Sequence, residues 1–284
     1  MLTPRNQSVV DEKPVMPLTE AEKDYILPPD PNSLDDMDLA INGFFLPKEW
    51  LTTAPPDYEF CVNPLIPMGA VTLLVGHGGT GKSLLALKMA IHTALGISVL
   101  GAKTSGGTVA YLSLEDPETI VWRRIFKIFH GLPEEVRQRA DELEAKMLLI
   151  CRYGILTHIA VNNSGKIEPA QIADDLSALL QWHGIKCIFV DTLVRTHTLP
   201  ENDNAQMGAL LVAFEKIVKK TGCAVVLIHH LPKSSDGKFP AAARGASAIT
   251  SNARSAMVLK SVDDKEADSF AEEGINSISK SSMI

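Results

Sequence analysis

The stretch VGHGGTGKSLLALKMA, residues 75–90, decides the fold, because an apolar approach, a glycine-rich loop and a helical pattern follow one another within it. Residues 76–83 fit the pattern GxxxxGK[ST] without mismatch. Glycines let backbone N–H groups curl around phosphate oxygens, and the N-terminus of the following helix adds partial positive charge. The stretch therefore predicts a phosphate-binding loop between a strand and a helix.

The residues that close this loop have the chemistry that a nucleotide site needs. Lys82 can reach the β- and γ-phosphates, and the Ser83 hydroxyl can ligate Mg²⁺. The His77 side chain stands at an open position of the pattern and is interpreted as incidental. The predicted nucleotide-binding residues here are Gly76, His77, Gly78, Gly79, Thr80, Gly81, Lys82, Ser83 and Leu84.

Strands and helices alternate on both sides of the loop. Strands are expected at 71–75, 107–114, 147–153, 185–191, 223–230 and 255–262, with a further candidate at 275–279. Helices are expected at 83–96, 117–131, 133–147, 168–184 and 204–222. This alternation predicts an α/β fold in which a mostly parallel sheet has helices on both faces.

Composition excludes several classes of protein. The only long uncharged run, residues 60–81, is broken by prolines and glycines, so no membrane span is expected. The N-terminus lacks the pattern of a signal peptide, and the four scattered cysteines show neither a disulfide framework nor zinc-ligand spacing. Cys187 and Cys223 lie in apolar runs and are predicted to be buried thiols. These features favour a cytoplasmic protein.

Charge is unevenly distributed along the chain. Residues 1–60 contain 12 acids and 4 bases, a net charge of −8, whereas the remainder contains 22 acids and 23 bases, a net charge of +1. Nine of the 17 prolines also fall within residues 1–60. Residues 1–45 are therefore predicted to be a flexible acidic arm, or one that orders against a partner, and residues 46–284 the folded domain.

Two acidic residues follow predicted core strands. Asp191 ends the apolar run CIFVD and is suited to hold the metal. Thr192, where many ATPases have a catalytic Glu, follows it, so Glu115 in YLSLEDP is the predicted base for in-line attack by water. Asp116 is interpreted either as a helper of Glu115 or as an N-cap of the next helix.

Two histidines end the run LIHH. A histidine in a core strand is most often a hydrogen-bonded core residue, but one at the carboxyl end of a strand can sense the γ-phosphate. We expect His230 rather than His229 to have this role.

The motifs GHGGTGKS, YLSLEDP, IFVDTLVRTH, LIHH and RGASAITSNAR together resemble the RecA/DnaB-type P-loop ATPase core. The set is most similar to ring-forming plasmid replicative helicases of the RepA type and related AAA-type ATPases. The resemblance covers roughly residues 50–262. The acidic arm is an addition to the family pattern, and the chain stops at INSISKSSMI, where relatives typically continue, so a truncated or divergent end is expected.

The resemblance implies a RecA-like hexamer with ATP and Mg²⁺ between subunits. It assigns catalytic roles to Lys82, Glu115, His230 and an arginine finger, which is either Arg244 or Arg254. Ser83 and Asp191 become the metal residues, and Arg124 a nucleotide-binding residue. The loops 192–204 and 231–243 would face single-stranded DNA through Arg195, Lys233 and Lys238.

These expectations favour an ATP-hydrolysing replicative DNA helicase of plasmid, phage or mobile-element type. Two alternatives stay open. One is a non-unwinding ATPase of the same fold, such as a recombination mediator or a loader. The other is a regulatory ATPase that binds protein partners. A replication protein is a candidate partner for the arm.

Overall fold

The computed structural model describes residues 45–231 and 253–261. Contacts divide the chain into two units, Met1–Asp57 and Tyr58–Ile284. The described part of the first unit contains the short helix α2 (Glu49–Thr52). The predicted arm lies outside the described residues except for residue 45, so its division from the domain at residue 46 stays a prediction.

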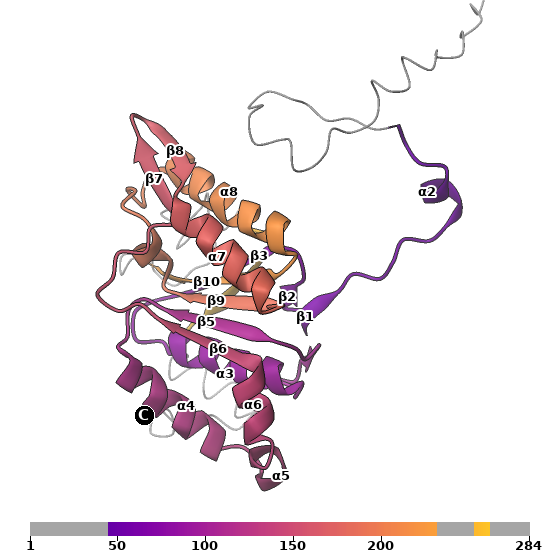
Figure 1. The fold of residues 1–284 in the computed structure, drawn as a ribbon, viewed down its shortest axis with the longest axis vertical. Coiled ribbons are helices and arrows are strands. Elements are labelled where there is room, and N and C mark those ends of the chain that lie inside the picture. Colours follow the sequence, from indigo (N-terminus) through magenta and orange to yellow (C-terminus); the bar gives the residue numbers. More distant parts are fainter. Residues whose placement is uncertain (1–44, 232–252, 262–284) are drawn as a thin grey trace, which may run out of the picture. The chain divides into compact units, whose positions relative to one another are not determined.

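A parallel sheet of six strands forms the centre of the second unit (Figure 1). Its strands are β3 (Val71–Gly76), β5 (Val109–Ser113), β6 (Met147–Cys151), β9 (Cys187–Asp191), β10 (Ala224–His230) and β11 (Ser255–Leu259). They lie in the order β11-β3-β10-β9-β5-β6, and every neighbouring pair is parallel. The predicted α/β fold is confirmed. The candidate strand at 275–279 lies outside the described residues.

Helices cover both faces of this sheet (Figure 1). One face packs against α3 (Lys82–Leu95), α4 (Glu118–His130) and α6 (Ala140–Lys146), and the other against α7 (Gln171–Trp182) and α8 (Asn204–Thr221). A hydrophobic core lies on each face of the sheet, and alternate residues of a strand contribute side chains to one core or the other. In β9, Phe189 faces α3, whereas Ile188 and Val190 face α7 and α8. The strand segments are continuous apolar runs because both faces of the sheet are buried.

Two small sheets were not expected from the sequence. The first joins β1 (Phe60–Asn63), β2 (Ile66–Pro67) and β4 (Lys103–Thr104) in the order β2-β1-β4. The second is a hairpin of β7 (Ala160–Asn163) and β8 (Lys166–Pro169). Its two-residue turn has positive φ at Ser164 and Gly165, as a turn matched to strand twist requires.

Two predicted helices differ from those observed. The helix expected at 168–184 begins only at Gln171, because residues 168 and 169 belong to β8. The helix expected at 133–147 is two helices, α5 (Glu134–Arg137) and α6. Arg139 leaves the helical conformation between them, and its guanidinium donates to the Leu95 carbonyl and to Glu142. A tertiary contact with α3 therefore accompanies the break.

Within the described part of the chain, no helix combines the length and apolar character needed to cross a membrane. Cys187 and Cys223 are buried thiols, as predicted, and Cys61 is buried as well.

Candidate active site

The glycine-rich loop joins β3 to α3, as the sequence predicts. Gly79 and Gly81 have φ of 77° and 89°, a region that disfavours residues with a Cβ. A Cβ added at Gly78, Gly79 or Gly81 would meet no atom within 4 Å, so the space above the loop is open. Gly76 differs, because a Cβ there would clash with the Leu259 carbonyl oxygen of β11. The loop is thus open around Gly78, Gly79 and Gly81 and closely packed against β11 at Gly76.

Lys82 is folded back into this loop. Its side chain is buried, and Nζ donates to the carbonyl oxygens of Gly76, at 2.8 Å, and His77, at 2.7 Å. Burial lowers the pKa of Lys82, and the carboxylates of Asp191 and Glu115 oppose that shift. His77 therefore contributes its backbone carbonyl at this position. When an anion binds in the loop, the N–H groups of Lys82 Nζ could donate to its oxygens instead of to these carbonyls.

Asp191 and Ser83 meet although they are far apart in the sequence. The Ser83 hydroxyl donates to Asp191 Oδ1 at 3.2 Å. The Tyr111 hydroxyl donates to Asp191 Oδ2 at 2.7 Å. Burial raises the pKa of Asp191, and the hydrogen bonds from Tyr111 and Ser83 counter part of that rise. The two predicted metal residues thus lie in hydrogen-bond contact, held by a tyrosine.

Tyr111 was not among the residues predicted from the sequence. It lies in β5, whose residues are all buried, and its ring faces the α3 side of the sheet. Burial raises the pKa of Tyr111 well above its usual value, and the neighbouring Asp191 adds to the rise, so the hydroxyl remains a donor. The sequence offers one signal that could have found it, a tyrosine in the middle of an apolar strand. A buried tyrosine hydroxyl usually forms a hydrogen bond, which indicates a polar partner nearby.

Glu115 lies just beyond the end of β5, close to His230, the last residue of β10. His230 Nε2 is 3.4 Å from Glu115 Oε2, and both side chains are partly exposed. His229 is buried instead, and burial, with the positive charges of its neighbours, lowers its pKa to about 4. Of the two histidines, His230 is therefore the one placed beside the predicted base.

Arg124 forms an ion pair with Asp116. The N-cap residue of α4 is Pro117, with no side-chain cap, so the interpretation of Asp116 as an N-cap is wrong. Arg124 and Leu84 both line a hollow of about 460 Å³ between α3 and α4. Its other lining residues are Lys88, Lys127, Ile128, Gly131 and Leu132.

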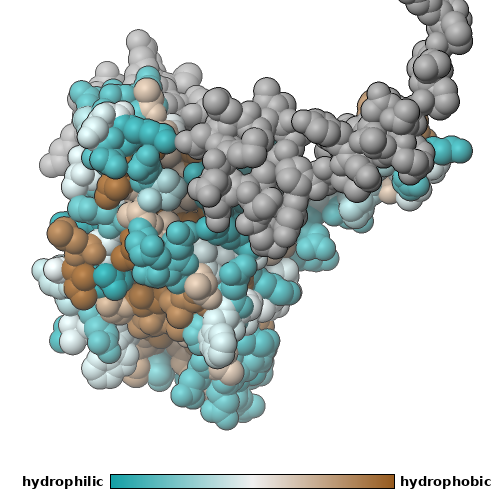
Figure 2. All heavy atoms as spheres, turned by 45° about the horizontal axis from the view of Figure 1, so that its top comes forward, coloured by the Kyte–Doolittle hydropathy of each residue, from teal (hydrophilic) through white to brown (hydrophobic). Residues whose placement is uncertain are grey.

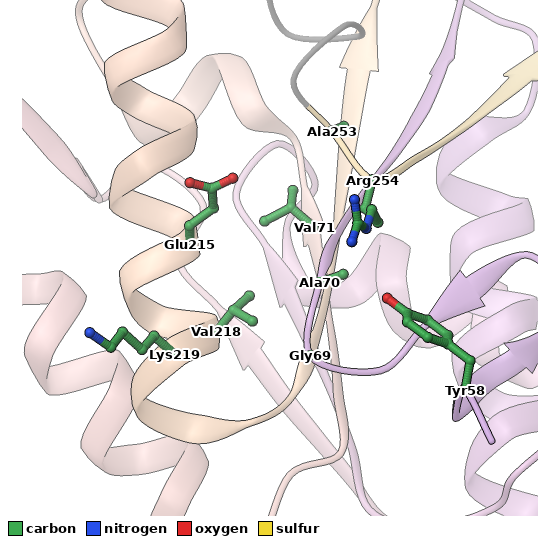
Figure 3. Close-up of a pocket in the computed structure, with 9 residues that line it drawn as sticks. All are labelled: Tyr58, Gly69, Ala70, Val71, Glu215, Val218, Lys219, Ala253 and Arg254. Carbon is green, nitrogen blue, oxygen red and sulfur yellow. The ribbon is translucent and has the colours of Figure 1, made fainter. Parts of the chain in front are cut away.

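Arg254 lies near the amino ends of the sheet strands, whereas the glycine-rich loop lies at their carboxyl ends. Its backbone N–H donates to the Val71 carbonyl, at the start of the strand that ends in the glycine-rich loop. Five residue steps along β3 separate that point from Gly76, a length of about 16 Å. Arg254 lines a hollow of about 580 Å³, with Tyr58 beside it and Glu215 and Lys219 of α8 across from it (Figure 3). It is therefore not brought to the site in its own chain.

The structure does not place the remaining predicted residues in this cluster. Arg195 is exposed on the short 3₁₀ helix η2 (Leu193–Thr196), which follows Asp191. Arg244, Lys233 and Lys238 lie outside the described residues. The structure thus joins the loop, the predicted metal residues, Glu115 and His230, and of the three predicted DNA contacts it describes Arg195 alone.

Comparison with protein families decides the class. A family model described as an AAA domain matches residues 44–236. The chain belongs to this AAA domain family. The glycine-rich loop of this AAA domain is therefore the nucleotide loop of a P-loop ATPase, and the sheet that carries it has the architecture of a RecA-like core.

Proposed function

We propose that this AAA domain hydrolyses ATP with Mg²⁺ and uses the energy to move on single-stranded DNA, as a ring-forming replicative helicase. One observation carries the proposal. The glycine-rich loop, the Ser83–Asp191 pair and the Glu115–His230 pair all lie at the carboxyl edge of one parallel sheet. That edge is where open α/β sheets bind ligands.

The residues present fit a magnesium ion. A serine hydroxyl and a carboxylate are hard oxygen ligands, and Mg²⁺ is commonly held by one or two such groups together with substrate phosphates. Ser83 and Asp191 would hold it, and their 3.2 Å contact already brings the two oxygens together. The ion would neutralise phosphate charge. Tyr111 keeps Asp191 oriented through the hydrogen bond to Oδ2.

The protein groups divide the work of hydrolysis. Lys82 Nζ transfers its hydrogen bonds from the loop carbonyls to phosphate oxygens. Glu115 orients a water for in-line attack on the γ-phosphorus and accepts its proton, while the bond to the bridging oxygen breaks, giving ADP and phosphate. His230, 3.4 Å from Glu115, holds that carboxylate and senses the γ-phosphate.

The hollow between α3 and α4 supports a place for the nucleoside. Leu84, which follows Ser83 in the sequence, lines it from α3, and Arg124 lines it from α4. Its volume of about 460 Å³ lies within the range of small-molecule sites, and its lining combines apolar and cationic side chains.

The position of Arg254 supports a site shared between subunits. At about 16 Å along β3 from the loop, Arg254 is too far away for its side chain to reach a γ-phosphate in its own chain. An arginine finger at this position must act on a neighbouring copy. A hexameric ring would supply that arrangement, with Arg244 as the alternative finger.

The DNA part of the proposal depends on Arg195, Lys233 and Lys238. The test is the rate of ATP hydrolysis with and without long single-stranded DNA at two salt concentrations, with Lys82→Ala as the inactive control. Stimulation that weakens with salt supports a DNA-coupled enzyme, because phosphate contacts release counterions. Rates indifferent to DNA would refute the helicase and favour a regulatory ATPase.

Strand displacement from a forked duplex then separates the remaining alternatives. A helicase displaces the strand in an ATP-dependent way, and Lys82→Ala abolishes the reaction. Stimulated hydrolysis without displacement would instead indicate a recombination mediator or a loader.

A further inference from the structure

Helix α4 carries exposed aromatic side chains that the active site does not use. Its inner side packs into the core through Val121, with Ile125 and Phe129 half-buried beside it. On the outer side, Trp122 is 66% exposed and Phe126 is 54% exposed. Large exposed rings are costly in water, and they also mark binding surfaces. Hydrophobic side chains among hydrophilic ones are visible on the face that Figure 2 presents.

The rings form a line along the helix. Trp122, Phe126 and His130 follow one another at intervals of four residues, so they share one side of α4. The rings of Phe126 and His130 are already stacked, with centroids 3.9 Å apart and planes inclined by 26°. We call these three residues the aromatic stripe.

Cations accompany the aromatic stripe. Arg123 and Lys127 each follow one of its rings in sequence, and both are exposed. Lys127 also lines the hollow between α3 and α4, whereas Arg123 does not. Neither has an ion-pair partner among the residues that the structure describes, unlike Arg124, which is paired with Asp116. One acid, Glu118, stands on the same side, one turn before Trp122. The surface therefore joins flat π-faces to two free positive charges.

We propose that the aromatic stripe with Arg123 and Lys127 is a binding surface for single-stranded nucleic acid. Rings that stack on bases, beside cations that meet phosphates, are the two components of sequence-tolerant single-strand sites. The rings favour a single strand over a duplex, because only unpaired bases can leave their own stack and lie against protein side chains. The aromatic stripe belongs to α4 and includes no residue of the predicted DNA loops 192–204 and 231–243, so this inference does not depend on the proposed helicase activity.

Tryptophan fluorescence can test this surface in the full-length chain. The protein has three tryptophans, Trp50, Trp122 and Trp182. Replacing Trp50 and Trp182 by Phe leaves Trp122 as the only reporter. Replacing Trp50 and Trp122 instead leaves Trp182, which is 85% exposed and serves as a matched control away from α4. Both proteins are titrated with oligothymidylate in the absence of nucleotide.

The proposal predicts that oligothymidylate quenches Trp122 and not Trp182. Phe126→Ala weakens this binding about tenfold, since one stacking partner is lost. Arg123→Gln lowers the slope of log affinity against log salt by about 0.7, the value for one phosphate contact to a single strand. Basal ATP hydrolysis is unchanged in both variants, which shows that they fold.

Three results would overturn the proposal. The first is an unquenched Trp122, and the second is equal quenching of both reporters, which indicates non-specific association. The third is quenching of Trp122 by a peptide of residues 1–44 but not by oligothymidylate, which would make the acidic arm the occupant. Because the readout needs no hydrolysis, a protein whose ATPase ignores DNA but whose Trp122 is quenched would contradict the helicase alone.

Discussion

Replacing Tyr111 by Phe tests how the proposed metal residues, Ser83 and Asp191, are held. The change removes one oxygen and keeps the ring in the core, so the loss is confined to the 2.7 Å hydrogen bond to Asp191 Oδ2 and a 3.3 Å contact to the Ser83 carbonyl. Hydrogen bonds to charged groups contribute about 1.5–3 kcal/mol. That range corresponds to a loss of about tenfold to a hundredfold in affinity for Mg²⁺, which also matches the usual effect of removing a group that orients a metal ligand.

The measurement is ATP hydrolysis as a function of Mg²⁺ concentration. We expect the Mg²⁺ concentration at half-maximal rate to rise by that factor, while the rate at saturating Mg²⁺ stays near that of the wild type. The pKa of Asp191, already raised by burial, should rise further without the tyrosine, so the loss of activity in acid should begin at a higher pH. Tyr153→Phe, at an exposed position, is the control.

An unchanged Mg²⁺ dependence in Tyr111→Phe would refute this reasoning. It would mean either that Asp191 does not hold the metal or that its orientation does not depend on Tyr111. A fall in maximal rate with no change in Mg²⁺ dependence would point to distortion of the loop instead.

Three further predictions concern other parts of the domain. Mixing Arg254→Ala with Lys82→Ala subunits should restore ATP turnover that neither has alone, because one supplies the site and the other the finger; no recovery would remove Arg254 as a finger. Since burial holds the pKa of His229 at about 4, against about 6.5 in the unfolded chain, its contribution to stability is complete above pH 6.5 and is lost as the pH falls toward 4. The loss amounts to about 3 kcal/mol, and His229→Gln should flatten the dependence of urea unfolding on pH by that amount. Gly76→Ala should destabilise the fold by about 1–3 kcal/mol, because its Cβ would meet a β11 carbonyl, whereas Gly78→Ala faces open space and should unfold at a nearly unchanged urea concentration.

The main features of the site could be predicted because parallel strands bring their carboxyl ends to one edge. Glu115, Asp191 and His230 each follow an apolar run, so the sequence alone indicates that they gather beside the glycine-rich loop. The register confirms the geometry, since Ser113 pairs with Asp191 and His230 with Gly76.

The features that could not be predicted depend on contacts between distant segments. The partner of Tyr111 lies 80 positions away, and nothing in a uniformly buried strand indicates which tyrosine reaches a carboxylate. The break at Arg139 coincides with its contact to α3, which a helical pattern does not record. Strands of two residues, such as β4, are too short to show an alternating pattern.

The sequence also does not show which side of α4 is exposed. A spacing of four residues, as between Trp122 and Phe126, fits the buried side of an amphipathic helix as well as its exposed side. Only the packing of Val121 inward shows that these two rings face outward.

The measurement that tests the central claim most directly is ATP binding and turnover by Glu115→Gln. The variant keeps the size of the side chain and removes its ability to accept a proton. We expect ATP to remain bound with affinity near that of the wild type, while turnover falls by about 10²–10⁴-fold, the usual contribution of a general base. Turnover at the wild-type rate would contradict the account, because the water would then be activated by a group other than Glu115.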